Sequence, residues 1–413
     1  MIFYKAVIDV AVAAQDEHVI PFPPEAYRES RRDGRVMLPY TVQWVDDQPY
    51  VAAVADPKFS RLVGRAIVRF DTNLASDVLD VLEATIPSDG SSETFAIRRL
   101  QDFTPTQNEN YFDLNYPIWF GAQSDYKIEV KGLAGTTESI SLKALDWKEF
   151  SDFYRKRLKR DAPVDFRWLD NDIAYLSINS FHDWYFEEHG LDAPDHFSKI
   201  FETLGTNPDA KLVLDLRQNE GGGDISSLLL DYLLQHPFRE YDAVFTRFVG
   251  QPAAARHCEN ADDVAFDPSW AEPSPETLFR LRPAFESLIT GAAERSPRPD
   301  AFGGELIVLT SGVTGSAAAK VVSVLDRQGR AYVIGEETGG TAVGATAFGY
   351  CSLILPESGI KVDIPLVRFE RHSEGEYGRG LIPDMRINAG RVPPVSENDE
   401  VLAAALTHLR KKH

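Results

Sequence analysis

The stretch ELIVLTSGVTGSAAAKVVSVLDRQG, residues 305–329, decides the fold class, because an apolar run passes through a turn of small residues into a helix pattern. ELIVLT predicts a buried strand, and AAAKVVSVLDRQG predicts a helix. The neighbouring segments repeat this alternation: strands are predicted at IAYLSINSF, KLVLDLR and AYVIGE, and helices at APDHFSKIFETLG and ISSLLLDYLLQH. Such alternation is typical of right-handed βαβ crossovers on a largely parallel sheet, so the sequence predicts an α/β fold.

The chain as a whole divides into three regions by pattern. Residues 1–36 predict a helical segment followed by a proline-containing loop that carries His18. Residues 37–145 contain short strand patterns around one helical stretch, ASDVLDVLEATI, and predict a small, mostly β domain. Residues 146–413 begin with a charged link, WKEFSDFYRKRLKRDAP, and contain the α/β domain. A Pro-rich segment at about 251–303, with a helical patch at ETLFRLRPAFESLI, is predicted to be an insertion or lid.

Composition limits the partners and the compartment. The chain has 413 residues and a formal net charge of -20, which argues against nucleic acid and anionic membrane surfaces as partners, because phosphate binding needs a basic footprint. No apolar run reaches the roughly 18–20 residues of a membrane span, and no signal peptide is visible, so localisation stays open. The two cysteines, Cys258 and Cys351, predict neither a disulfide framework nor a CxxC metal or redox site.

A glycine-rich turn follows the strand pattern in LVLDLRQNEGGGD. Gly221, Gly222 and Gly223 open the next helix there, and bare backbone amides at such a turn can face a phosphate or a developing oxyanion. The run is neither GxGxxG nor GxxxxGK[ST], so a nucleotide site is not indicated. A purely structural tight turn is the alternative that the residues leave open.

Ser316 is the candidate nucleophile in the opening stretch. If ELIVLT and LVLDLR are parallel neighbours, their carboxyl ends share one edge of the sheet, and Ser316 lies near the glycine turn. Small neighbours leave its hydroxyl accessible, and the N–H of Ala317 would face an oxyanion formed beside it. A serine in the first turn of a helix is often only an N-cap, and the residues leave this alternative open.

Several side chains in the sequence could act as the base for Ser316, and spacing does not choose among them. His18, His182 and His372 all lie near predicted ends of elements. Lys320 lies one helical turn after Ser316, and its position predicts a side chain at the surface.

A series of short motifs covers most of the chain, in the order AAQDEHVIPFPP, DLRQNEGGG, VLTSGVTGSAAAKVV, GRAYVIGEETGG and GRGLIPDMRI. Together they resemble the motifs of tail-specific or C-terminal processing serine peptidases, in the branch that includes the tricorn core protease and the interphotoreceptor retinoid-binding protein modules. The resemblance implies a crotonase-like or ClpP-like α/β catalytic domain. It also implies that the 37–145 region takes the place of a PDZ-type domain.

The resemblance assigns catalytic roles to residues. Ser316 corresponds to the nucleophile, and His18, in the segment that resembles D-x-H, corresponds to the base. Glu337 stands where the processing proteases carry a lysine in G-E-K-T, so a Ser/Lys pair is not implied. The third group of the branch is a glutamate shortly before the final P-D; Tyr377 aligns there, and the adjacent Glu376 is assigned the role of orienting the base.

The resemblance also implies an oxyanion hole. It would consist of the N–H of Ala317 and an N–H of Gly221 or Gly222. Ala319 stands where the family often has a glutamate three residues after the serine. No metal, nucleotide or other cofactor is implied.

The sequence therefore predicts a serine peptidase that cleaves peptide or protein substrates, with a β region that binds extended chains by strand addition. Two alternatives remain: a catalytically inactive peptide- or lipid-binding protein on the same fold, and a crotonase-like acyl hydrolase. The departures at Ala319, Glu337 and Tyr377 favour the inactive alternative. Substrate sequence, endo- or C-terminal specificity and oligomeric state stay open.

Overall fold

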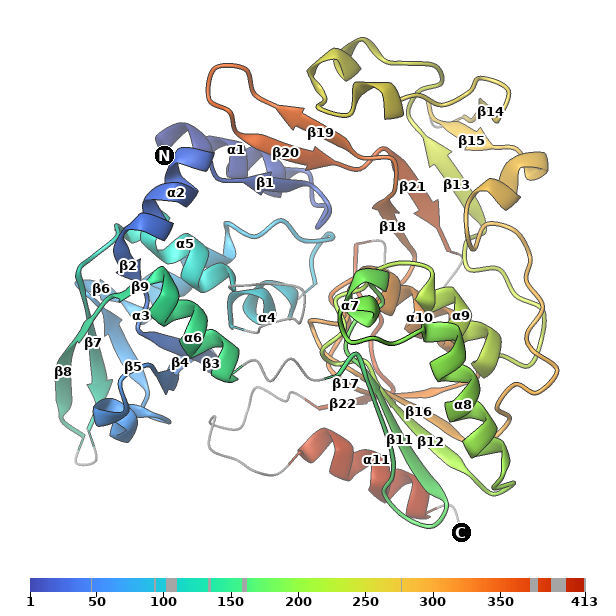
Figure 1. Cartoon of the computed structure of the whole chain (residues 1–413), viewed down its shortest axis with the longest axis horizontal. Coiled ribbons are helices and arrows are strands. Elements are labelled where there is room, and N and C mark those ends of the chain that lie inside the picture. The colour runs from blue at the N-terminus through green and yellow to red at the C-terminus, as the bar shows by residue number, and fades with distance from the viewer. Residues whose placement is uncertain are drawn as a thin grey trace.

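The computed structural model describes residues 1–45, 47–92, 94–101, 110–132, 135–157, 162–275, 277–371, 378–387 and 399–411. Figure 1 shows the N-terminal elements, in blue and teal, gathered on one side and the α/β elements, from green to red, on the other. Within these ranges, none of the helices combines the length and the apolar character that crossing a bilayer requires.

The α/β fold predicted from the sequence is confirmed by a six-stranded sheet in the order β10-β11-β12-β16-β17-β22. Its strands are β10 (Val164–Trp168), β11 (Ile173–Ile178), β12 (Lys211–Asp215), β16 (Leu306–Thr310), β17 (Tyr332–Gly335) and β22 (Met385–Arg386). All described pairings in it are parallel except that of β10 with β11. The strands of KLVLDLR and ELIVLT are therefore parallel neighbours, and their carboxyl ends lie at one edge of the sheet.

Helices cover both faces of this sheet (Figure 1). One face packs against α8 (Ala193–Gly205), α9 (Ile225–Leu233) and α10 (Ser316–Arg327), and the other packs against α11 (Glu400–Lys411). The short helix α7 (Asp183–Glu188) follows β11. Because α9 and α10 begin just after β12 and β16, their N-termini meet at the edge where these strands end.

Residues 37–145 contain the predicted strands but more helix than predicted. β3 (Tyr40–Val45) pairs with β4 (Gln48–Val54), and a second sheet has the order β6-β5-β7-β8. Its strands are β5 (Ile67–Phe70), β6 (Asn73–Leu74), β7 (Asp125–Lys131) and β8 (Thr137–Lys143). The predicted helix is α3 (Ala75–Glu83), and two further helices, α4 (Phe95–Gln101) and α5 (Tyr111–Phe120), pack into the same hydrophobic cluster. Pro117 lies inside α5, where its helix-breaking tendency argues against a helix in a local pattern.

The N-terminal segment begins with the predicted helix, α1 (Ile2–Ala13), and continues with β1 (Ile20–Phe22), α2 (Glu25–Asp33) and β2 (Arg35–Met37), which pairs with β9 (Leu145–Asp146). The charged segment that was expected to be a link is the helix α6 (Trp147–Arg157). Phe150 and Tyr154, one helical turn apart, pack on Met37, and this tertiary contact stabilises the helix despite its charged composition.

Two smaller sheets lie above the α/β sheet in Figure 1. One has the order β14-β15-β13-β21-β18 and the other the order β1-β20-β19. Their strands, besides β1, are β13 (Ala243–Thr246), β14 (Ala271–Pro273), β15 (Phe279–Leu281), β18 (Gly344–Ala347), β19 (Cys351–Ile354), β20 (Lys361–Ile364) and β21 (Val367–Glu370). The helical patch predicted in ETLFRLRPAFESLI is wrong, because β15 pairs with β13 and only Pro283–Leu288 forms a short 3-10 helix.

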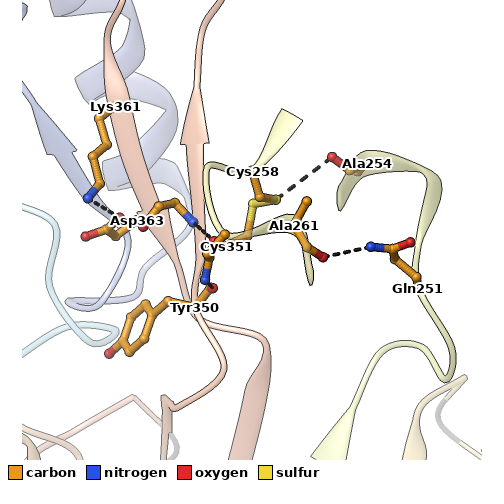
Figure 2. Close-up of a disulfide and its surroundings, with 10 residues drawn as sticks. Gln251, Ala254, Cys258, Ala261, Tyr350, Cys351, Lys361 and Asp363 are labelled. Atoms are coloured by element: carbon orange, nitrogen blue, oxygen red, sulfur yellow. Dashed lines mark hydrogen bonds and ion pairs between the residues drawn. A yellow bond between two sulfur atoms is a disulfide. The ribbon is translucent and has the colours of Figure 1, made fainter. Parts of the chain in front are cut away.

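A disulfide joins the Pro-rich segment to β19, as Figure 2 shows. Cys258 and Cys351 are 93 residues apart, and their Cα atoms lie 5.3 Å from each other. The chain around Cys258 also donates from the Glu259 N–H to the carbonyl of Ser352, and Asn260 donates to the carbonyl of Tyr350. The two cysteines thus form one covalent bridge, although the sequence predicted no disulfide framework, because only the packing of distant segments brings them together.

Candidate active site

Ser316 is the first residue of α10, directly after the turn that follows β16. The N-cap position is Gly315, and no side chain caps the helix, so the N-cap alternative for the serine is wrong. The backbone of Ser316 has φ +43°, a left-handed conformation that costs a non-glycine residue about 1–3 kcal/mol. A strained serine on a strand-to-helix turn presents its hydroxyl outward, as in the nucleophile elbow of α/β-hydrolases.

His18 reaches this hydroxyl from the loop between α1 and β1. Its Nε2 lies 3.1 Å from Ser316 Oγ, although 298 residues separate the two in sequence. The loop is fixed at two points, because the backbone N–H of His18 donates to Asp16 Oδ1 at 2.9 Å and the N–H of Ser316 donates to Glu17 Oε1 at 3.2 Å. The pair therefore has the separation at which an imidazole can take a proton from a serine.

Carboxylates surround the His18 imidazole. Burial lowers the pKa of His18, but its interaction with the Asp16 carboxylate and the negative charges of Glu17 and Asp89 outweigh burial and raise the pKa to about 9. Burial raises the pKa of Asp16, yet its contacts with His18 and Thr346 leave it lowered. Burial and the charge of Glu17 raise the pKa of Asp89. The site therefore favours the protonated imidazolium, the form that His18 takes after it accepts a proton.

The glycine turn lies directly against the serine, as the parallel strands predicted. A Cβ on Gly221 would come within 2.7 Å of the Cβ of Ser316, so only glycine fits there. The N–H of Gly221 donates to Asn219 Oδ1 at 2.9 Å. Among the described residues, by contrast, the N–H groups of Gly222 and Ala317 have no acceptor. These two amides are therefore the ones free to bind an oxyanion.

A cleft of about 990 Å³ opens beside the serine. His18, Ser316, Ala317 and Gly222 line it. Its other walls are mixed, with apolar side chains of Tyr241, Leu288, Ile289, Phe348 and Phe369 and charged ones of Arg99, Glu187, Glu220 and Arg371. The cleft is wide enough for several residues of a polypeptide, and its mixed lining suits a main chain with varied side chains.

Lys320 corrects one prediction. Its side chain is buried rather than at the surface, and its Nζ forms an ion pair with Glu240 and a 3.2 Å hydrogen bond with Ser227 Oγ. Helix α10 packs against α9, so the turn after Ser316 faces the protein interior. Because its ammonium group is held by Glu240, Lys320 is not placed to act on Ser316.

The other predicted residues differ in where they lie. Glu337 is buried and pairs with Arg379, at 2.7 Å, so it has a structural partner. His182 lines the cleft and stands at the N-cap position of α7 without a capping side-chain hydrogen bond, and in the described structure it makes no hydrogen bond to Ser316. Glu376 and Tyr377 lie outside the described residues, as does His372.

Sequence reasoning missed the acidic residues around His18. Asp16 and Glu17 are its direct neighbours in QDEHV, and their charge could have been noticed there. Asp89 follows α3, and no motif marks it. One donor atom from each of Asp16, His18 and Asp89 lies within 4.8 Å of the others, but since the imidazole faces Ser316, we interpret the cluster as charge partners of His18 and assign it no ion.

Comparison with known proteins gives a consistent result. Residues 172–387 match the model of peptidase family S41. No curated protein matches the chain in sequence. Among solved structures, mature CPAF is similar over 99% of this chain and 88% of that chain, with a TM-score of 0.65 and 16% identity. Mature CPAF complexed with lactacystin is similar over 99% of this chain and 87% of that chain, with a TM-score of 0.61 and 17% identity.

At these identities the solved structures establish the shared fold, an α/β fold that extends over nearly the whole chain. The photosystem II D1 C-terminal processing protease also matches, over 98% of this chain and 85% of that chain, with a TM-score of 0.41 and 14% identity. The family match covers more than half of the chain, including the strand before the glycine turn, the turn and Ser316. The chain belongs to peptidase family S41 and is a serine-type peptidase.

Proposed function

We propose that the protein cleaves peptide bonds with Ser316 as nucleophile and His18 as general base. The observation that carries this proposal is the 3.1 Å separation of His18 Nε2 and Ser316 Oγ within a cleft. Neutral His18 takes the proton as Ser316 Oγ attacks the substrate carbonyl, and the resulting imidazolium gives that proton to the leaving amine. Water then attacks the acyl-serine carbonyl as His18 takes its proton, and His18 gives that proton to Ser316 Oγ as the acyl group leaves as a carboxylic acid.

The oxyanion of each tetrahedral intermediate is bound by the N–H groups of Ala317 and Gly222. Gly222 lies shortly before α9 and Ala317 lies in the first turn of α10, where the helix N-terminus adds partial positive charge. Gly221 contributes space rather than a donor, because its own N–H is engaged by Asn219. The family resemblance assigns the orienting role to Glu376, which lies outside the described residues, so that assignment stays a prediction for mutagenesis.

An extended peptide substrate fits the strand beside the cleft. Among the described strands of its sheet, β18 is an outer strand, and its residues Ala345 and Ala347 line the cleft. An outer strand offers unpaired main-chain groups that an extended peptide can pair with, whatever its side chains. We further propose that the α/β domain is of the crotonase-like class and that the 37–145 region takes the place of a PDZ-like domain, as the motifs implied.

The proposal is tested by hydrolysis of an unfolded, fluorescently labelled protein by the wild type and by Ser316→Ala and His18→Ala variants. We expect both variants to lose at least about 1,000-fold in kcat/KM while their thermal unfolding midpoints stay close to that of the wild type. Full hydrolysis by Ser316→Ala would rule out the proposed nucleophile. If instead His182→Ala is inactive and His18→Ala is active, the assignment of the base is wrong.

A further inference from the structure

We propose that Asp89 is the residue that positions His18, by accepting a hydrogen bond from the Nδ1–H of the imidazole. The inference rests on the proposed function, because it concerns the proton path from Ser316. In a serine-histidine pair, a third group must hold the imidazole in the tautomer whose Nε2 is free to accept the serine proton. Asp89 comes from the N-terminal region, far from both residues in sequence.

The His18 imidazole and the Asp89 carboxylate each have, within the described structure, a buried polar atom without a hydrogen-bond partner. Among the described residues, His18 Nδ1 and Asp89 Oδ2 are both buried without a hydrogen-bond partner. Asp89 is only 5% exposed, so water does not readily satisfy its free oxygen. One possible ligand atom of each side chain lies within 4.8 Å of the other, so the hydrogen bond forms when the two side chains move closer together. Catalytic hydrogen bonds often tighten only when substrate binds.

Asp16 is the competing carboxylate, but each of its oxygens already accepts one hydrogen bond from another group. Asp16 Oδ1 accepts the backbone N–H of His18 at 2.9 Å, and Asp16 Oδ2 accepts the hydroxyl of Thr346. Its separation from His18 Nδ1 is 3.6 Å, which suits an ion pair rather than a hydrogen bond. We therefore assign to Asp16 the role of fixing the loop and to Asp89 the role of fixing the ring.

The Asp89 loop is anchored to the loop that carries His18. Asp89 Oδ1 accepts the N–H of Glu17 at 2.9 Å, and the N–H of Gly90 donates to the carbonyl of Gln15 at 3.2 Å. Gly90 also approaches Gly378 so closely that a Cβ on it would lie 2.2 Å from the Gly378 oxygen. This anchoring holds the carboxylate beside the imidazole before substrate binds, as positioning requires.

The charged groups around the imidazole determine what loss of Asp89 should do. Asp16, Glu17 and Asp89 face His18 with negative charge. Two cations of other elements lie in the same cleft: Arg99 of α4 lies 4.0 Å from Glu17, and Arg371 follows β21. Removal of the Asp89 charge should therefore lower the pKa of His18 from about 9, whereas a residue with a purely structural role would leave it unchanged.

Asp89→Asn is the decisive variant. The asparagine oxygen can still accept the N–H of Glu17, but its NH2 group then faces His18 Nδ1 and favours the tautomer whose Nε2 carries the proton. We expect kcat to fall by at least about 100-fold. We also expect the pH at which kcat/KM is half-maximal to move at least one unit lower, while the thermal midpoint changes little.

Three further variants make the outcome unambiguous. Asp16→Asn is the matched control. It should lower kcat less than about 10-fold, since its amide can still accept from the His18 N–H and donate to the Thr346 hydroxyl. Glu376→Gln tests the rival orienting residue. Ser316→Ala separates the two proposals: if it remains active, the proposed function and the role of Asp89 fail together.

With Ser316→Ala inactive, two results would overturn the role of Asp89 alone. One is an Asp89→Asn enzyme whose kcat is within about 3-fold of the wild-type value and whose pH dependence of kcat/KM is unshifted. The other is a loss confined to Asp16→Asn or Glu376→Gln. If Asp89→Asn does not fold, Asp89→Ser, which keeps an acceptor for the Glu17 N–H and removes the charge, is measured against the same criteria.

Discussion

At the scale of single residues, the strained backbone of Ser316 and the acidic surroundings of His18 distinguish this site from an ordinary helix start. The serine could be predicted from its small neighbours and from the strand before it, because both are local in sequence. Its φ of +43° and its contact with His18 could not, because they depend on a loop 298 residues away. Asp89 could not be predicted for the same reason, because only tertiary structure brings it near His18.

The raised pKa of His18 predicts an alkaline enzyme. A general base must be neutral to take the serine proton, so kcat/KM should rise with pH and level off only above about pH 9. The His18 charge also stabilises the folded state: with a folded pKa of about 9 against 6.5 unfolded, this stabilisation is complete below pH 6.5 and is lost as pH rises through 9. The pH dependence of kcat/KM on a peptide substrate tests the raised pKa of His18, and a profile that is half-maximal below pH 7 would contradict it.

The buried ion pair of Lys320 with Glu240 should stabilise the fold, although the sequence position of Lys320 predicted a side chain at the surface. The Lys320→Met variant leaves the buried carboxylate of Glu240 without its cation, and we expect it to lower the free energy of unfolding by about 3–5 kcal/mol. The Lys320→Met, Glu240→Gln double variant removes both charges and should recover part of that loss. Urea unfolding compares the two, and a single variant within 0.5 kcal/mol of the wild type would exclude a buried pair.

At the scale of elements, the order of strands and helices in the α/β region could be predicted because each has its own hydrophobic period. The helices α5 and α6 could not, since α5 contains Pro117 and α6 has a charged sequence that only the packing of Phe150 and Tyr154 supports. The glycine turn lies between these cases. Its place beside Ser316 followed from the parallel pairing of β12 and β16, whereas its atomic contacts depend on the tertiary packing of the two turns.

Two glycines of this turn should respond differently to alanine. A Cβ on Gly221 would meet the Cβ of Ser316 at 2.7 Å, and its φ of +121° is unfavourable for alanine, so Gly221→Ala should abolish hydrolysis and cost about 1–3 kcal/mol in stability. A Cβ on Gly223 would lie 3.3 Å from a side-chain oxygen of Asp183 and 3.7 Å from the Phe181 carbonyl oxygen, and Gly223→Ala serves as the control. Equal activities of the two variants would show that Gly221 does not shape the site.

At the scale of the whole molecule, the catalytic groups come from distant parts of the chain. Ser316 and the glycine turn follow strands of the α/β sheet, His18 lies before β1, and Asp89 lies after α3 in the 37–145 region. β1 pairs with β20, which pairs with β19, and the disulfide fixes β19 to the Pro-rich segment (Figure 2). The fold thus supports His18 through one continuous sheet, and no local sequence pattern contains that information.

The disulfide should therefore affect both stability and catalysis. A cross-link between residues 93 apart restricts the unfolded chain, and its loss in the Cys258→Ser, Cys351→Ser variant should cost about 2–5 kcal/mol. Because β19 supports β1, we also expect kcat to fall several-fold, and a dithiol reductant should reproduce both effects in the wild type but not in the variant. Unchanged unfolding in reductant would show that the bridge does not contribute.

The central claim is that His18 activates Ser316 for attack on a carbonyl. Reaction with a fluorophosphonate tests it most directly, because the reagent traps the activated hydroxyl without any assumption about substrate sequence. Mass spectrometry should find a single adduct on Ser316 in the wild type, at least 100-fold slower labelling in His18→Ala, and none in Ser316→Ala. A well-folded wild-type protein without an adduct, or with the adduct on another residue, would contradict the account.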